Sequence, residues 1–160
     1  MKRLLILPLL MTAMIVSSCS SCNNRKQVQE EDPNVVVLFD GETFEGWRAY
    51  NGTEIPGAWT VEEGAIKING SGRGEAGAEN GGDIIFDRKF GNFELTFEWK
   101  VAKGSNSGVF YLAQEVPGEP IYISAPEYQV LDNENHPDAF LGIDGNRQSA
   151  SLYDMIPAKP

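Results

Sequence analysis

The stretch from residue 93 to residue 101 alternates strictly between apolar and polar side chains. Its apolar members are Phe93, Leu95, Phe97, Trp99 and Val101. Successive side chains of a β-strand point to opposite faces, so this period of two predicts a strand with one buried face. We therefore expect Phe93, Phe97 and Trp99 to lie in the core of a β-sheet protein.

Shorter apolar runs follow one another from residue 35 onward, and clusters of glycine and asparagine separate them. These runs cover residues 59–61, 66–68, 84–86, 109–112 and 128–131. The first two flank Glu62-Glu63-Gly64, a turn-forming sequence that predicts a hairpin. No long window has the 3.6-residue repeat of an amphipathic helix. The pattern predicts an all-β domain over residues 35–160, built as a sandwich or a barrel.

The first residues have the composition of a secretory leader. The basic residues Lys2 and Arg3 precede an apolar run over residues 4–16, and the small residues after this run lead to Cys19. A membrane-spanning helix needs ~20 apolar residues, and this run is shorter. Residues 1–18 are therefore interpreted as a signal peptide and kept out of the fold.

Cys19 follows Val-Ser-Ser at the end of this leader, and the sequence resembles the lipidation motif of bacterial lipoproteins. The resemblance implies cleavage before Cys19, acyl chains on that residue, and anchoring at the bacterial cell envelope, for which we expect the outer membrane. An ordinary leader is the alternative, and Cys22 is a second, weaker candidate for lipidation. Residues 19–34 are polar, and we expect the segment after the cysteine to be a disordered tether.

Composition narrows the chemistry of the domain. The only two cysteines, Cys19 and Cys22, precede it, so we expect no disulfide, no cysteine-bound metal and no thiol nucleophile there. The formal net charge of the whole sequence is -10 at pH 7. Such an acidic surface repels phosphate backbones, so nucleic acid is not an expected partner.

The segment from residue 126 to residue 139 carries the densest set of chemically useful side chains. Its polar members are Glu127, Gln129, Asp132, Glu134, His136 and Asp138, and His136 is the only histidine in the sequence. On a strand, Glu127 and Gln129 share one face, while Tyr128 takes the other. The face with Glu127 and Gln129 is either a solvated outer face or the floor of a cleft. Glu134 and Asp138 are expected to be solvent charges.

Five segments, in this order, resemble those of one protein family. They are LFDGETFEGW (38–47), GNFELTFEWKV (91–101), SNSGVFYL (105–112), EYQVLDNENHPD (127–138) and ASLYDMIPAKP (150–160). They are similar to the 3-keto-disaccharide hydrolases, also described as 3-keto-glycoside lyases or hydratases. The resemblance implies a concanavalin A-like antiparallel β-sandwich, or jelly roll, in a secreted lipoprotein. Family members continue through further strands, so we expect this chain to be an incomplete domain.

The resemblance also implies a reaction, in which an oligosaccharide or glycoside already oxidised at C3 loses its C2 proton and then its C1 substituent. Such a site needs a base and an electrophile for the enolate oxygen, and a divalent metal of the Ca, Mg, Mn or Co type could be the electrophile. The implied metal ligands are Glu127, Gln129 and His136. His136 and Glu127 are the expected catalytic residues, with His136 as the provisional base because imidazole titrates near neutral pH. The expected substrate-binding residues are Gln129, Asp132, Asn106 and Arg147.

Two other functions remain open at this point. A non-catalytic carbohydrate-binding module would need only a polar cleft with aromatic stacking, because a sandwich fold does not dictate function. A lipoprotein that only binds partner proteins is the third possibility. Trp47 and Trp59 could stack on sugars, although large aromatic side chains are more often part of the core.

Overall fold

The computed structural model describes residues 33–70 and 81–159. The chain divides into two units, residues 1–35 and residues 36–160, and the second contains every strand described below. The expected signal peptide (1–18), Cys19 and most of the expected tether lie outside the described residues. Among the described residues, no helix is long and apolar enough to cross a membrane.

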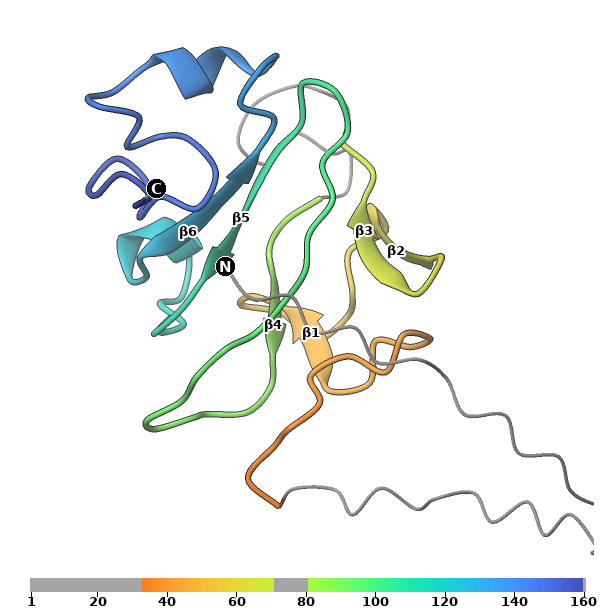
Figure 1. Cartoon of the computed structure of the whole chain (residues 1–160). Helices are drawn as coiled ribbons and strands as arrows, with labels where there is room; N and C mark the ends of the chain where they lie inside the picture. Colours follow the sequence, from red (N-terminus) through yellow and green to blue (C-terminus); the bar gives the residue numbers. More distant parts are fainter. Residues whose placement is uncertain (1–32, 71–80, 160) are drawn as a thin grey trace, which may run out of the picture. The chain divides into compact units, whose positions relative to one another are not determined.

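The described residues form an all-β structure of short antiparallel strand pairs, as the sequence predicts (Figure 1). The strands are β1 (Trp47–Ala49), β2 (Trp59–Glu62), β3 (Ala65–Ile68), β4 (Ile84–Phe86), β5 (Asn106–Phe110) and β6 (Glu127–Leu131). They pair as β1 with β4, β2 with β3, and β5 with β6. Two short 3-10 helices, η1 (Ile121–Ile123) and η2 (Pro137–Phe140), flank β6 in sequence.

The β2–β3 hairpin confirms the prediction made from its turn sequence. Glu62 pairs with Ala65, which leaves Glu63 and Gly64 as a two-residue loop. Both loop residues have positive φ, 53° at Glu63 and 75° at Gly64. Turns of this kind match the twist of the flanking strands, and glycine adopts the second position without steric cost.

Residues 93–101 do not form the predicted strand. They have no regular secondary structure, and the side chains expected in the core are exposed at Phe93 (48%) and Trp99 (47%) and half-buried at Phe97. The prediction was wrong because a strand also needs a neighbour for its N–H and C=O groups, and no described strand pairs with this segment. The alternation still has a consequence, since the rings of Phe97 and Trp99 contact Tyr128 at centroid distances of 5.3 and 5.8 Å.

Strand β5 is shifted from the predicted 109–112 run. It begins at Asn106 and ends at Phe110. The backbone leaves the strand conformation at Leu112, which has a φ of 57° and is 65% exposed. Asn106, one of the expected substrate-binding residues, is therefore the first residue of a strand.

Strand β6 is bonded along both of its edges. On one edge it pairs with β5, with Gly108 opposite Gln129. On the other edge, residues 149–153 run antiparallel to it, as the dark blue C-terminal chain beside β6 indicates (Figure 1). There Gln129 N donates to Ser151 O at 3.0 Å, and Tyr153 N donates to Glu127 O at 2.9 Å. The side chains with the lowest exposure therefore gather on and around β6, with Leu131 at 2% and Gln129 at 1%.

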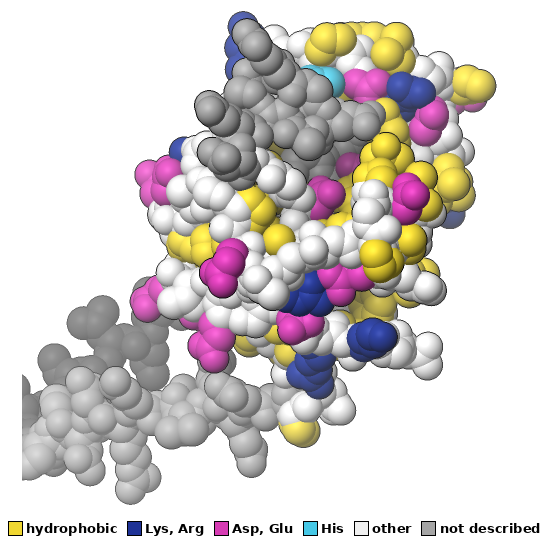
Figure 2. Space-filling view, turned by 180° about the vertical axis from the view of Figure 1, so that it is seen from behind, with side chains coloured by type: hydrophobic (Ala, Val, Ile, Leu, Met, Phe, Trp, Pro, Cys, Tyr) yellow, Lys and Arg dark blue, Asp and Glu magenta, His cyan; other side chains and the backbone are white. Residues whose placement is uncertain are grey.

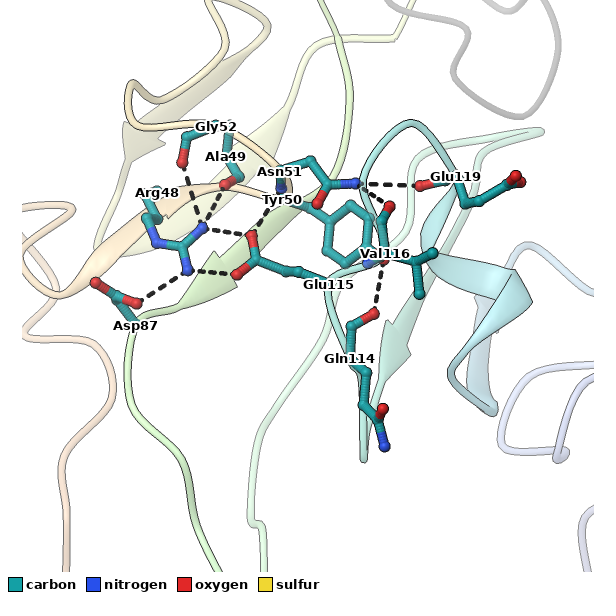
Figure 3. Close-up of polar contacts among 10 residues, drawn as sticks. All are labelled: Arg48, Ala49, Tyr50, Asn51, Gly52, Asp87, Gln114, Glu115, Val116 and Glu119. Atoms are coloured by element: carbon teal, nitrogen blue, oxygen red, sulfur yellow. Dashed lines mark hydrogen bonds and ion pairs between the residues drawn. The ribbon is translucent and has the colours of Figure 1, made fainter.

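Strand β1 and the turn after it are tied to the β5–β6 connection by a polar network (Figure 3). Arg48 Nη1 and Nη2 donate to the two carboxylate oxygens of Glu115 at 2.6 and 2.7 Å, and Nη2 also donates to Asp87. The Asn51 backbone N–H donates to Glu115 at 2.8 Å, and its side-chain amide donates to the carbonyl of Val116. The paired Arg48 guanidinium lowers the pKa of Glu115 to about 2.

Trp47 and Trp59 act as structural anchors. The indole N–H of Trp47 donates to Leu38 O at 2.7 Å, and that of Trp59 donates to Gly82 O at 2.8 Å. The ring of Trp47 also meets Phe86 edge-on. Both tryptophans are partly buried with their polar atom satisfied by backbone, which supports packing rather than sugar stacking.

Candidate functional site

One face of the β5–β6 pair and of residues 149–153 collects polar side chains, and we call it the polar face. Residues directly opposite each other in an antiparallel pair project to the same side. Asn106 lies opposite Leu131, Gly108 opposite Gln129, and Phe110 opposite Glu127. The hydrogen bonds to residues 149–153 add Ser151 opposite Gln129 and Tyr153 opposite Glu127. The polar side chains of this face are Asn106, Glu127, Gln129, Ser151 and Tyr153.

The centre of the polar face is closed to solvent. Gln129 is 1% exposed and Ser151 is 0% exposed. The side-chain oxygen of Gln129 accepts a hydrogen bond from Val130 N at 2.9 Å. The hydroxyl of Ser151 has no hydrogen-bond partner, and it is the single buried side-chain polar atom of the described residues in that state. Glu127 and Asn106, which flank this centre, are half-buried and exposed respectively.

Glu127 is held over the neighbouring strand at Gly108. A Cβ atom built on Gly108 would lie 2.6 Å from Glu127 Cγ and would also overlap the Glu127 carboxyl group. The side chain of Glu127 therefore leans across β5 and occupies the volume that a side chain at position 108 would fill. This diagonal contact can form only because position 108 has no side chain.

Arg147 closes a cluster of charges at the end of the polar face that carries Tyr153. Its Nε and Nη2 donate to the two carboxylate oxygens of Asp154 at 2.9 Å each, and Nη1 donates to Asp138 at 2.9 Å. Asp138 also accepts from the Tyr153 hydroxyl at 2.8 Å. Burial, reinforced by this bond to Asp138, raises the pKa of Tyr153 to about 12. With its guanidinium bonded to two carboxylates, Arg147 fixes the fold around Tyr153.

His136 and Asp132 serve the turn that follows β6. Nδ1 of His136 accepts a hydrogen bond from Asp138 N at 3.2 Å and so caps η2. The Asp132 carboxylate accepts from Gly104 N at 2.8 Å and from the side chain of Asn135 at 2.7 Å. These bonds, the one from Gly104 above all, hold the pKa of Asp132 below its usual value. Both side chains therefore stabilise the turn after β6, whether or not they also contact substrate.

The three expected metal ligands do not fit one ion as they lie. Gln129 is buried with its amide oxygen already bonded to Val130, and Nδ1 of His136 is bonded to Asp138. The backbone N–H of His136 donates to Asp132 O at 3.0 Å. Asp132 lies five positions after Glu127 along the chain, a span of about 16 Å at the usual strand rise. Within residues 33–70 and 81–159, no three His, Cys, Asp or Glu side chains gather as a metal site.

One face of the molecule carries scattered acidic side chains. Aspartate and glutamate side chains are spread over the face drawn in Figure 2, and the histidine reaches the surface there. No broad basic patch appears among the described residues of that view. This distribution agrees with the net charge of -10 and does not favour a polyanionic ligand.

A comparison with known protein families shows the family to which this chain belongs. Residues 34–160 match the model of the family described as the 3-keto-alpha-glucoside-1,2-lyase-like domain. The chain belongs to this family. The match includes every strand in the part of the chain that the structure describes, so the polar face is part of a 3-keto-alpha-glucoside-1,2-lyase-like domain.

Individual relatives agree with the family match. The chain is 62% identical over 143 residues to a protein of Bacteroides thetaiotaomicron named 3-keto-disaccharide hydrolase. This alignment covers 84% of the chain and 49% of the relative, so the chain spans about half the length of that protein. A crystal structure from Parabacteroides distasonis, provisionally named a glycosyl hydrolase, superimposes with a TM-score of 0.60 at 27% identity. That alignment covers 78% of this chain and 59% of the solved one.

Two residues of the polar face, Ser151 and Tyr153, were not predicted from the sequence as part of the site. Their signal was an alternation, because Ser151 and Tyr153 flank the apolar Leu152 as strand residues of one face would. The structure brings Asn106, Glu127 and Gln129 onto one face with them. It places Asp132 and His136 in the turn after β6, and Arg147 in the cluster with Asp138 and Asp154.

Proposed function

We propose that the protein cleaves 3-keto-glycosides by elimination across C1 and C2 of the oxidised sugar, with Glu127 as the base. The observation that carries this proposal is the family match over residues 34–160, which contains the polar face. The curated relative named 3-keto-disaccharide hydrolase supports the same class of substrate. A glycoside with a keto group is the partner that this chemistry requires.

In the proposed elimination, the main group that the protein must supply is a base placed next to C2. The ketone at C3 acidifies the C2 proton, and the carboxylate of Glu127 takes that proton. The electron pair left on C2 forms the C1–C2 double bond as the bond from C1 to the glycosidic oxygen breaks. The proton on Glu127 returns to the departing oxygen, and water that later adds to the double bond completes a net hydrolysis.

Glu127 is a better base in this geometry than His136. A neutral imidazole has one acceptor nitrogen, and Nδ1 of His136 already accepts from Asp138 N at 3.2 Å. A proton taken up at Nδ1 would break the cap of η2. Glu127 is half-buried on the polar face, and the same face carries the exposed amide of Asn106, which could hydrogen-bond a sugar oxygen.

Metal assistance stays a separate hypothesis that rests on the family resemblance. A divalent cation, when bound, would polarise the C3 carbonyl and stabilise the enolate oxygen. The predicted set of Glu127, Gln129 and His136 does not fit a single ion as described above, so no step of the proposed reaction passes through it.

The test is turnover of a 3-keto-glucoside by the full-length protein, with products identified by mass spectrometry. Glu127→Gln removes the base and should lower turnover by ~10²–10⁴-fold, whereas the matched variant His136→Ala should retain most of it. A chelator, followed by addition of Ca, Mg, Mn or Co, decides whether metal is needed. If His136→Ala loses turnover and Glu127→Gln keeps it, the base is His136. A wild-type protein that binds glycans and never cleaves them would be a binding module.

We also propose that the domain is part of a concanavalin A-like β-sandwich, with the β5–β6 pair in one of its sheets. The all-β architecture, built of antiparallel strand pairs, supports this arrangement. A crystal structure of the full-length protein tests it. A full-length structure whose strands do not form two antiparallel sheets packed face to face would contradict the proposal.

Lipid anchoring at Cys19 is a further proposal that the leader sequence supports. Two or more acyl chains hold a protein stably on a membrane, and a single chain does not. Mass spectrometry of protein extracted from the outer membrane should find Cys19 at the N-terminus, carrying a diacylglyceryl group. A soluble protein that begins at another residue would refute the anchor.

A further inference from the structure

Gly108 is the middle residue of β5, yet nothing in its backbone conformation calls for glycine. It pairs with Gln129 inside the β5–β6 ladder, and its φ is not positive. Glycine in a strand interior is unfavourable by roughly 0.5–1 kcal/mol relative to alanine, and it is used where another group approaches the backbone closely. A close neighbour of Gly108 therefore explains why this position is a glycine better than its backbone conformation does.

The group that approaches Gly108 is the side chain of Glu127. All three atoms nearest to a Cβ built at position 108 belong to this side chain, with Cγ at 2.6 Å. Real Cβ atoms do not come so close to another atom, so an alanine at position 108 and Glu127 in its present place exclude each other. At Gly91, in contrast, the space around the Cβ position is open and φ is not positive.

The Glu127 carboxylate can take its present place only because this gap exists, since a side chain at position 108 would displace it before substrate arrives. A displacement of about 1 Å at a reacting group is enough to cost ~10²-fold in rate. Gly108 and Glu127 sit on adjacent strands of one ladder, so the rigid backbone of β5 sets where the carboxylate can lie.

We propose that Gly108 is a positioning residue, whose missing side chain creates the seat on β5 that holds the Glu127 carboxylate in its reactive place. The proposal rests on the proposed function, in which Glu127 is the base. It assigns to Gly108 a role in catalysis that involves no contact with substrate.

The experiment is a double-mutant cycle in the full-length protein, with Gly91→Ala as the matched control. With a 3-keto-glucoside as substrate, Gly108→Ala should lower kcat by ~10²-fold with a much smaller change in KM, because the base is displaced while binding groups remain. In the Glu127→Gln background, which has no base to displace, Gly108→Ala should change kcat by less than about twofold. The acid limb of the pH–rate profile should also move in Gly108→Ala and stay fixed in Gly91→Ala.

A second arm of the experiment does not depend on turnover. Gly108→Ala should lower the Tm by several degrees, and Glu127→Ala should restore most of that loss, since it removes the side chain that the new methyl group strikes. The proposal is overturned if Gly108→Ala keeps wild-type kcat, or if its Tm loss is the same in the Glu127→Ala background. If the wild-type protein cleaves no 3-keto-glucoside, the proposed function fails, and the Tm cycle alone then decides whether Gly108 seats Glu127.

Discussion

Tyr153 donates a hydrogen bond through its hydroxyl to Oδ2 of Asp138, at 2.8 Å. The other carboxylate oxygen of Asp138 accepts from Arg147, so one carboxylate joins the turn after β6 to the chain that runs beside β6. Asp138 was expected to be a solvent charge, and its side chain is instead 15% exposed. These two bonds fasten the turn after β6 to the C-terminal segment.

We expect Asp138→Asn to loosen this junction. The amide cannot accept from Arg147 and Tyr153 as the carboxylate does, so the free energy of unfolding should fall by ~1–3 kcal/mol in chemical denaturation. The pKa of Tyr153, now about 12, should move toward its usual value but stay above it, because burial is its main cause. A Tyr titration by NMR, assigned with Tyr153→Phe, measures the shift. Glu134→Gln is the control on the same turn, and an equal loss of stability there would contradict the prediction.

The Arg48–Glu115 pair should make stability depend on acid pH. The pKa of Glu115 in the folded chain is about 2, below the usual 4.5, because Arg48 and the Asn51 N–H stabilise its charged form. A lowered folded pKa gives stability that is present above about pH 4.5 and lost as the pH falls toward about 2. Urea unfolding at several pH values should show Glu115→Gln less stable than wild type at pH 7 and nearly equal to it at pH 2.

Glu119→Gln is the control for that experiment. Glu119 lies on the same connection, and its contact with Asn51 uses the backbone carbonyl, which the substitution leaves intact. Its stability should follow the wild-type curve at every pH. A Glu115→Gln variant whose deficit is the same at pH 2 and pH 7 would show that packing, and not charge, makes the difference.

Ser149 and Ser151 should respond oppositely to the same substitution. The hydroxyl of Ser149 donates to Leu131 O at 2.7 Å and accepts from Leu131 N at 2.9 Å, so Ser149→Ala should destabilise by ~1–3 kcal/mol. The hydroxyl of Ser151 is buried without a partner, so Ser151→Ala should be neutral or stabilising. Thermal unfolding of both variants checks the pair. A clear loss in Ser151→Ala would mean that a buried water or a ligand bonds this hydroxyl.

Ala150→Gly should stabilise the chain. Ala150 and Ser151 both lie opposite Gln129, as in a β-bulge, because Ala150 N donates to Gln129 O and Gln129 N donates to Ser151 O. The φ of Ala150 is 69°, a left-handed conformation that glycine adopts more easily. The gain should be about 0.5–1 kcal/mol in the free energy of unfolding. Ala65→Gly, in an ordinary strand position, is the control and should lose a similar amount.

The sequence predicted best where structure depends on near neighbours. The β2–β3 hairpin follows from Glu63-Gly64, whose conformations set the register of the strands on either side. The prediction of a strand at residues 93–101 failed for a different reason. Alternation shows which side chains would share a face of a strand, but it does not show which neighbouring strand would accept and donate the backbone hydrogen bonds. The pairing of residues 149–153 with β6 was not predicted because the bulge at Ala150 interrupts the alternation that is typical of a strand.

The candidate site was predicted in part. The shared face of Glu127 and Gln129 follows from strand geometry alone, and the register of β6 agrees with it. The pairing of Arg147 with Asp138 and Asp154 could not be read from spacing, because three turns of irregular chain bring these charges together. The cap that His136 gives to η2 also depends on how the chain turns after β6. Roles for His136, Asp132 and the metal stay predictions.

The two-sided bonding of β6 has a consequence for local motion. The amide of Gln129 points to residues 149–153, so its proton can exchange with solvent only after that segment has detached from β6. The amides of residues paired across to β5 stay shielded when the same detachment occurs. Hydrogen exchange at alternate positions of this one strand would therefore separate the opening of its outer neighbour from the unfolding of the β5–β6 pair.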